Sequence, residues 1–156
     1  MTDRIAGVYT LHAVPVEDGR MEAPVLLDSP HSGNSYPADF GTIVPLPILH
    51  RVEDAFVDQL YGDAPDQGAA LLCAEFPRSY IDPNRAEDDL DWRLLETPWP
   101  APLAITEKTR LGHGLVWRSC PGDLPMYDRL LSIEEVRNRI ETSWRPYHAT
   151  LESELT

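Results

Sequence analysis

The chain has 156 residues, of which 42% are hydrophobic and 25% charged, a composition typical of a globular domain rather than a disordered segment. Its formal net charge of −13 argues against nucleic acids and anionic membranes as partners, because both require clustered lysine and arginine. We therefore expect no nucleic-acid partner, no membrane partner and a single domain over residues 1–156.

The N-terminus and the cysteines indicate the cellular compartment. Residues 1–10, MTDRIAGVYT, lack the apolar core of a signal peptide, and no apolar stretch approaches the ~18 residues of a membrane span. Two cysteines are too few for a disulfide framework. Cys73 lies in the apolar run AALLCAEF, which favours a buried free thiol. These features predict a soluble, cytoplasmic protein.

The segment APVLLDSPHSG predicts a short buried strand, Val25–Asp28, that runs into a turn, because Pro30 and Gly33 break regular structure. His31 follows the C-terminal end of this strand, and open α/β sheets bind their ligands at that edge. A histidine in this position is either a structural residue or a ligand, and the sequence leaves both interpretations open.

Residues 48–61 predict a helix with one apolar face. The apolar residues at three- and four-residue steps are Leu49, Val52, Phe56 and Leu60. On such a helix Asp54 projects away from the apolar face and Glu53 lies at its rim. Both could be surface acids. Alternatively, one of them joins His31 at a metal, because histidine with carboxylate suits Zn²⁺.

The rest of the chain contributes two further strands and the clearest helix. Strands are predicted within residues 68–76 and 112–119, each preceded by glycine. Residues 132–155 show helical periodicity with a capping box at the start, and Pro146 should kink or interrupt the helix. Strands and helices in this order favour an α/β fold with a mixed or parallel sheet flanked by helices.

The stretch RSYIDPNR places Arg78, Asp82, Asn84 and Arg85 in a proline-marked loop. Lys108 is the only lysine among 13 basic residues, and arginine grips carboxylates through two parallel hydrogen bonds. Two guanidiniums and a carboxamide could hold a substrate carboxylate and an amide oxygen, with Asp82 and the acids after it holding the arginines in place. The alternative is an Arg–Asp network that only stabilises the loop.

Together these motifs resemble the N-formylglutamate amidohydrolase family. The resemblance covers residues 25–151 and rests on SPHSG followed by YP, on EDAFVDQLY, on GA with FPRSYIDPNR, and on GHGLVWR and PYHATL. That family is similar to zinc carboxypeptidases and aspartoacylases. The resemblance thus implies a zinc-carboxypeptidase-like hydrolase core that uses one divalent metal ion, Zn²⁺. The implied reaction removes the formyl, or a similar acyl, group from an anionic N-acyl amino acid such as N-formylglutamate.

By match of motif, the resemblance assigns His31 as a metal ligand and Asp54 as a second, with Glu53 as the alternative to Asp54. The family pattern continues beyond PYHATL into a strand carrying Asp-Cys-His-Ser, where the third ligand is expected, and a catalytic zinc normally takes three protein ligands. The domain is therefore expected to be incomplete or shortened. His113 and His148 are the remaining candidates for the third position.

The resemblance also assigns the substrate contacts. Arg78 would be catalytic, polarising the scissile carbonyl, while Asn84 and Arg85 would bind the α-carboxylate, and Ser32 of SPHSG is assigned to substrate binding. The alternative is a non-catalytic or truncated relative that binds a carboxylate ligand without turnover. An incomplete domain would present an uncovered sheet edge, which predicts self-association.

Overall fold

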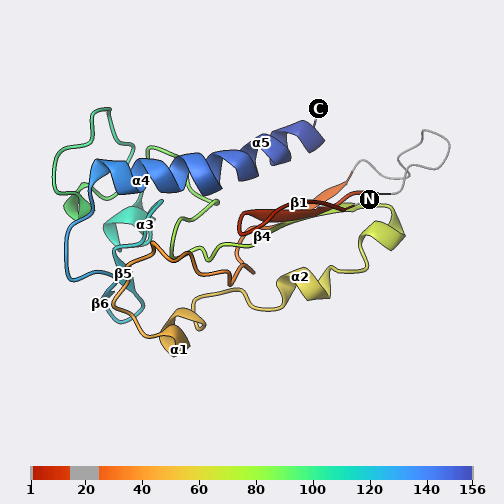
Figure 1. Ribbon diagram of the computed structural model, residues 1–156, viewed down its shortest axis with the longest axis horizontal. Helices are drawn as coiled ribbons and strands as arrows, with labels where there is room; N and C mark the ends of the chain where they lie inside the picture. Colours follow the sequence, from red (N-terminus) through yellow and green to blue (C-terminus); the bar gives the residue numbers. More distant parts are fainter. Residues whose placement is uncertain (1, 15–24, 156) are drawn as a thin grey trace.

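The computed structural model describes residues 2–14 and 25–155. It contains a four-stranded sheet in the order β1–β2–β4–β3. The strands are β1 (Thr2–Ile5), β2 (Tyr9–His12), β3 (Leu26–Ser29) and β4 (Ala70–Ala74). β2 pairs with β1 and β4 in antiparallel fashion, whereas β3 and β4 are parallel. Figure 1 shows the C-terminal helix on one side of this sheet and α2 on the other. The fold is therefore α/β with a mixed sheet, one of the two arrangements predicted.

The remaining described chain is largely irregular, with short helices and one small hairpin. These elements are α1 (Leu46–Leu49), α2 (Val57–Leu60), α3 (Glu107–Arg110), β5 (Ser119–Cys120), β6 (Leu124–Pro125) and two 3₁₀ turns, Pro65–Gln67 and Trp92–Leu94. β5 and β6 form a separate antiparallel pair. Long irregular connections agree with the fifteen prolines of the chain, since proline lacks the N–H that helices and sheet ladders require.

Two of the three predicted strands are confirmed, as β3 and β4, and β4 is buried at all five positions. The prediction for residues 112–119 is wrong, because regular pairing in this segment begins only at Ser119. Gly112 has a φ of +93°, a left-handed backbone that does not continue a strand. The hairpin of β1 and β2 was not predicted. Its signal is Gly7, which turns the chain at a φ of +77°.

The continuous helix predicted over residues 48–61 is also wrong. α1 ends at Leu49 and α2 begins at Val57, and the left-handed φ of 68° at Phe56 separates them. Phe56 and Leu60, expected on a buried face, are 66% and 80% exposed. The apolar periodicity therefore does not mark a core-facing helix here.

The interruption has a tertiary cause in the SPHSG turn. The Asp54 N–H donates to His31 O at 3.1 Å, and the Asp58 N–H donates to Ser32 Oγ at 3.2 Å. A continuous helix would have directed both N–H groups to carbonyls four residues earlier. These contacts fix residues 54–58 against the turn and bring Asp54 beside His31.

The C-terminal segment forms one long helix with a change of pitch (Figure 1). Its parts are α4 (Ile133–Arg139), a π-helical turn (Ile140–Trp144) and α5 (Arg145–Glu154). The capping box is confirmed: Ser132 Oγ accepts from the Glu135 N–H, and the Glu135 carboxylate accepts from the Ser132 N–H. The predicted effect of Pro146 takes the form of the wider π-turn just before it, and the proline itself occupies the first turn of α5.

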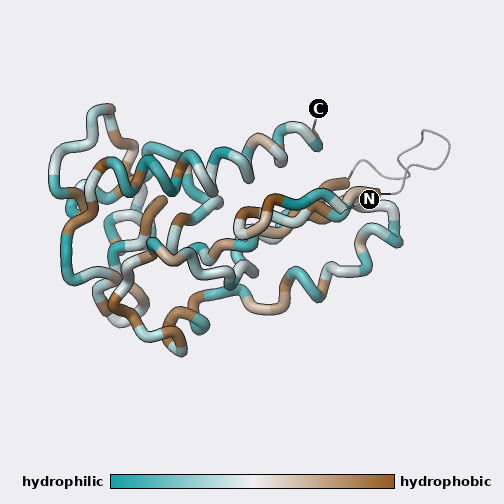
Figure 2. The backbone as a smooth tube through the Cα atoms, viewed as in Figure 1, coloured by the Kyte–Doolittle hydropathy of each residue, from teal (hydrophilic) through white to brown (hydrophobic). Residues whose placement is uncertain are grey.

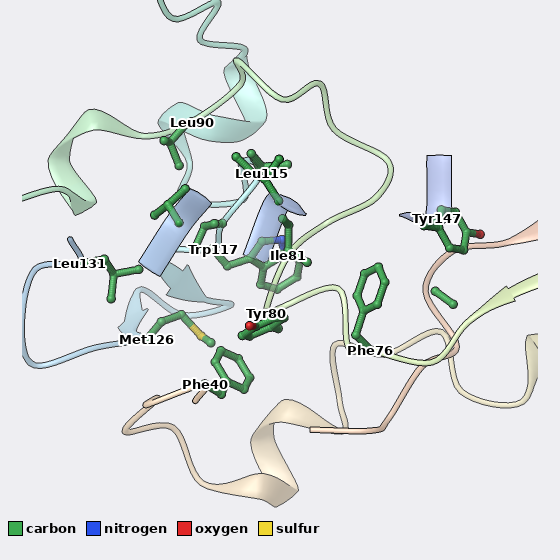
Figure 3. Close-up of a cluster of buried hydrophobic side chains, with 14 of the residues drawn as sticks. Phe40, Phe76, Tyr80, Ile81, Leu90, Leu115, Trp117, Met126, Leu131 and Tyr147 are labelled. Carbon is green, nitrogen blue, oxygen red and sulfur yellow. The ribbon is translucent and has the colours of Figure 1, made fainter. Parts of the chain in front are cut away.

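Aromatic side chains connect the sheet to the rest of the core. Figure 3 shows Phe76, which follows β4, facing Tyr147 of α5, and their ring centroids are 6.1 Å apart. Tyr80 packs edge-on against Phe40 at 5.3 Å. Figure 2 shows both hydrophobic and hydrophilic stretches in the sheet, of which β4 (ALLCA) is apolar and β1 (TDRI) largely polar, while the C-terminal helix is largely hydrophilic. The loop after β4 is thus anchored in the core on both sides.

Two smaller expectations concern the cysteines and the membrane. Cys73 is free and buried, as predicted, and Cys120 is likewise. Burial raises the pKa of the Cys73 thiol to about 12, which keeps it protonated and unreactive. In the part of the chain that the structure describes, no helix is long and apolar enough to cross a bilayer.

Candidate active site

The turn after β3 and the loop after β4 meet at one edge of the sheet. Because β3 and β4 are parallel, their C-terminal ends lie side by side. Gly33 allows the two connections to touch, since a Cβ at this position would lie 2.3 Å from Phe76 O and 2.6 Å from Glu75 O. His31, before this glycine, is thereby held against the loop that carries Asp82.

His31 lies between two carboxylates and is 8% exposed. Its Nε2 is 2.9 Å from Asp82 Oδ1, and its Nδ1 is 3.1 Å from Asp54 Oδ2. Asp82 is fully buried, whereas the Asp54 side chain is 54% exposed. A carboxylate only accepts hydrogen bonds, so a proton on Nε2 is required to bond Asp82. The ring is thus anchored on its buried side and directs Nδ1 towards the more open side.

Asp82 joins the histidine to the arginine loop. Besides His31, it accepts hydrogen bonds from Arg78 Nη2 at 3.0 Å and from the Asn84 N–H at 3.0 Å. Burial opposes its ionisation, but the His31 hydrogen bond and the charges of Arg78 and Arg85 outweigh burial and lower the pKa of Asp82. The carboxyl is therefore ionised at neutral pH, and its three donors fix the positions of His31 and Arg78.

Arg78 is held on one side and has unused groups on the other. Its Nη1 lies 3.6 Å from Asp54 Oδ2, and its guanidinium carbon lies 5.3 Å from the Trp117 ring centroid. Three buried nitrogens near this contact, Arg78 Nε, Trp117 Nε1 and His113 Nε2, have no hydrogen-bond partner in the described chain. Buried polar groups without partners are rare in folded proteins and mark places that water or a ligand completes.

Asn84 and Arg85 lie at the open end of the loop. Arg85 donates from Nε to His113 O at 3.1 Å and from Nη1 to Asn84 O at 2.6 Å. The Asn84 residue is exposed, and its carboxamide bonds no residue within 2–14 or 25–155. Burial, followed by the charges of Lys108, Arg78 and Arg85, lowers the pKa of His113. A locally positive region therefore exists within this acidic protein.

Comparison with known proteins places the chain in a family. A model of the family described as N-formylglutamate amidohydrolase matches residues 23–156. The chain belongs to the N-formylglutamate amidohydrolase family. A crystal structure of an N-formylglutamate amidohydrolase from Ralstonia eutropha JMP134 is similar, with 48% identity and a TM-score of 0.89 over 96% of this chain and 52% of that one.

Curated relatives give the same assignment. N-formylglutamate deformylases are 33% identical over 147 residues in Pseudomonas putida and 31% identical over 140 residues in Pseudomonas aeruginosa. The alignments cover 85% and 87% of this chain but 45% and 47% of the relatives. The chain thus spans about half the length of these relatives.

Two of the residues assigned by family resemblance have side chains bonded to groups other than the His31 ring. Glu53 has a side chain only 4% exposed, and its carboxylate accepts from the Tyr36 hydroxyl and contacts His50 Nδ1 at 3.1 Å. The Ser32 hydroxyl bonds Ser29 Oγ at 2.6 Å and the backbone of residues 54 and 58. In this arrangement Asp54, not Glu53, faces His31, and the Ser32 hydroxyl is occupied in shaping the turn.

The other two histidines considered for a metal have different surroundings. The His113 ring packs on Trp117 with centroids 4.7 Å apart, and His148 Nε2 lies 2.9 Å from Pro83 O. Among residues 2–14 and 25–155, no group of three His, Cys, Asp or Glu side chains is arranged to hold a metal ion. The described residues thus bring together two of the assigned ligands, His31 and Asp54.

The acids that follow Asp82 do not hold the two arginines, contrary to the sequence-based expectation. Glu87 pairs with Arg145, and Asp91 pairs with Arg93 and Arg118. Asp89 instead accepts hydrogen bonds from two threonines of the α3 region. These acids stabilise the connection to α3 and β5, and Arg78 is paired instead with Asp82 and, at 3.6 Å, with Asp54.

An open cleft of about 1030 Å³ lies beside the SPHSG turn, next to the cluster formed by His31, Asp54, Arg78 and Asp82. The cleft is lined by Ser32, Asn34, His50, Glu53 and Phe56, among others, but not by His31, Arg78 or Arg85.

The sequence did not predict the roles of Trp117 and Trp144, which contact the loop arginines. Their signal is their presence within or next to the family motifs GHGLVWR and PYHATL.

Proposed function

We propose that this chain carries the metal-binding and substrate-binding part of an amidohydrolase that removes the formyl group from an N-formyl amino acid such as N-formylglutamate. One observation carries the proposal: a single buried carboxylate, Asp82, holds both His31 and Arg78. A group suited to a metal and a group suited to an oxyanion are thereby fixed next to each other. The names of the relatives supply the reaction class.

The arrangement of His31 and Asp54 fits two ligands of a divalent metal ion. Metal-binding histidines typically donate one ring N–H to a carboxylate, which orients the other nitrogen, and Asp82 is placed for this role. His31 Nδ1 and Asp54 Oδ2 would hold the ion, and Zn²⁺ suits this donor pair. When bound, the ion polarises the amide carbonyl and lowers the pKa of coordinated water from ~15.7 towards ~7.

Arg78 and the Asn84–Arg85 pair would bind the substrate. Arg78 faces the same side as Asp54, so its guanidinium would meet the charge that develops on the amide oxygen, a contact typically contributing ~3–4 kcal/mol. The Asn84 carboxamide and the outer edge of Arg85 would bind the α-carboxylate. In a chain of net charge −13, an anionic substrate needs such a local concentration of positive charge.

The test is release of formate from N-formyl-L-glutamate by the purified protein supplied with Zn²⁺, with N-acetyl-L-glutamate as a second substrate to define the acyl group. Because the described residues bring together two ligands where a catalytic zinc normally has three, we expect weak binding of about one Zn²⁺ per chain and slow release of formate, both abolished in His31→Ala. His50→Ala is the matched control, because His50 lies outside the cluster and contacts Glu53. Binding of N-formyl-L-glutamate without formate release would instead indicate a carboxylate-binding relative. No binding would contradict both.

A further inference from the structure

The C-terminal helix contacts the backbone of the substrate loop at two points. Trp144 Nε1 donates to Arg85 O at 3.0 Å, and His148 Nε2 lies 2.9 Å from Pro83 O. A carbonyl oxygen only accepts, so Nε2 of His148 carries the proton. The two carbonyls flank Asn84 on either side. Both side chains therefore bind the peptide backbone of the loop and leave its side chains available.

The two rings act together because of their spacing on the helix. Trp144 and His148 are four residues apart, which places them on one side of the helix, and their rings stack with centroids 3.9 Å apart at 30°. Stacking restricts each ring to one orientation. The ring nitrogens are therefore held in directions that match the Pro83 and Arg85 carbonyls.

The π-helical turn sets which side of α5 meets the loop. A π-turn holds more residues than an α-turn, so the side chains after an extra residue are rotated by about 100° relative to an uninterrupted helix. The turn ends at Trp144, and Pro146 starts α5 without needing a backbone N–H. Tyr147, between the two rings in sequence, bonds the Asp28 carboxylate of β3.

We propose that Trp144 and His148 are positioning residues, together a clamp that orients the Asn84 carboxamide and the Arg85 guanidinium towards a substrate carboxylate. This inference rests on the proposed function, since it assigns the clamp to the same site. Its physical basis is the way the loop is held. Asp82 accepts the Asn84 N–H, His148 bonds the Pro83 carbonyl of that same peptide, and Trp144 bonds the Arg85 carbonyl of the Arg85–Ala86 peptide. The groups that would bind the carboxylate are then preorganised rather than ordered by the ligand.

A merely structural role makes a different prediction from a positioning role. If the clamp only attached the helix to the core, its loss would lower the melting temperature and leave the affinity of the folded protein unchanged. If it positions Asn84 and Arg85, its loss lowers affinity for a carboxylate ligand in the folded protein, with kcat changing less than KM. The two interpretations therefore separate on affinity measured beside stability.

The experiment titrates N-formyl-L-glutamate calorimetrically into the wild type and four variants, each with a thermal melt. Trp144→Phe keeps an aromatic ring but removes the N–H, and His148→Met removes the donor, while His148→Gln offers a replacement donor. Thr142→Ala is the control, because it removes a side-chain hydrogen bond to Asn138 O within the same helix. We expect Trp144→Phe and His148→Met each to weaken binding about tenfold, in line with the loss of one hydrogen bond.

We expect His148→Gln to recover part of the affinity and Thr142→Ala to retain all of it. Binding by both clamp variants within twofold of a wild type that does bind would overturn the positioning role and leave the proposed function standing. Losses of affinity matched by Thr142→Ala would overturn it as well. A wild type that binds no N-formyl amino acid would contradict the proposed function itself, and the positioning role with it.

Discussion

Two arginine environments in this molecule show how differently the same side chain is used. Arg139 of α4 is 1% exposed and donates to Tyr80 O at 3.0 Å, to Phe40 O at 3.1 Å and to the Tyr127 hydroxyl at 2.7 Å. The rings of the same three residues surround its guanidinium, at 4.3–5.6 Å from their centroids. All of these partners are neutral groups of the protein. This arginine joins α4 to the loops around it.

The arginines of the loop are anchored only in part. Arg78 binds Asp82 through Nη2 while its Nε has no partner in the described chain. Arg85 uses Nε and Nη1 for backbone carbonyls, and its Nη2 bonds none of the described residues. A buried arginine whose hydrogen bonds all go to neutral groups of the protein stabilises the fold. One that is fixed at one edge and open at the other is arranged to bind a ligand.

The largest expected effect is at the enclosed arginine. Arg139→Met should lower the free energy of unfolding by about 3–5 kcal/mol, because two carbonyls and a phenol lose their donor in a buried site. Urea denaturation of the variant and the wild type measures this loss. The KM and kcat of the protein that remains folded should be near those of the wild type. A loss below about 1 kcal/mol would break the comparison, since Arg139 would then not be structural.

Arg78→Lys tests the oxyanion role. We expect kcat to fall by roughly 10²–10³ with a smaller change in KM, because this contact strengthens in the transition state. The planar fork that binds Asp82 while facing the substrate is lost, although the charge remains. Steady-state kinetics with N-formyl-L-glutamate measures kcat and KM, and a thermal melt of the same variant measures its stability. A fall in activity fully explained by a lower melting temperature would mean that Arg78 only stabilises the loop.

Arg85→Lys should act mainly on substrate binding. Loss of a bidentate contact to the α-carboxylate should raise KM by roughly 10- to 100-fold with little change in kcat. Arg145→Lys is the matched control, because Arg145 is an exposed arginine that pairs with Glu87 and Glu141. Surface pairs of that kind contribute little. An equal rise of KM in both variants would remove the distinction between ligand-binding and surface arginines.

The smallest effect is expected at the ion pair between Arg4 of β1 and Glu75, which follows β4. Glu75 accepts hydrogen bonds from Arg4, from the Gly7 N–H and from Thr10 Oγ1, and the Arg4 hydrogen bond is the main reason that its pKa falls to about 2. Its folded pKa is below its usual value, so its contribution is complete above pH ~4.5 and is lost as pH falls towards 2.

Glu75→Gln should therefore lower the melting temperature at pH 7, by an amount equivalent to about 1 kcal/mol or less, because the Arg4 side chain is 58% exposed and solvent screens the pair. Melts of the variant and the wild type across pH 2–7 measure the difference. It should shrink as the pH falls below ~4.5. A difference that stays constant down to pH 2 would show that the carboxylate charge is not what stabilises the hairpin.

The sequence could predict those parts of the fold that depend on local pattern. β3, β4 and the capping box of α4 follow from apolar runs and cap chemistry in neighbouring residues. The interrupted helix could not be predicted, because the hydrogen bonds that break it come from His31 and Ser32, more than twenty residues earlier. Apolar periodicity carries no information about hydrogen bonds that a turn distant in sequence makes to the backbone of the segment.

At the candidate site too, the sequence identifies motif residues but not the tertiary contacts between them. Family motifs point to His31, Arg78 and Arg85, and the structure places all three around one loop. The choice of Asp54 over Glu53 beside His31 depends on where the helix breaks, which is a tertiary effect. Trp144 could not be connected to the loop from sequence, because its indole reaches Arg85 O only after the π-turn has set its direction.

The most direct test of the central claim compares two ligands that differ only at the α-carboxylate. N-formyl-L-glutamate carries this group, and N-formyl-L-isoglutamine replaces it by an amide while keeping the formyl group and the side-chain carboxylate. Calorimetric titration of the wild type should show roughly 10- to 100-fold tighter binding of the first ligand, and this preference should collapse in Arg85→Lys. Equal affinity of the wild type for both ligands, or a preference that survives in Arg85→Lys, would contradict the assignment of the arginine loop to the α-carboxylate.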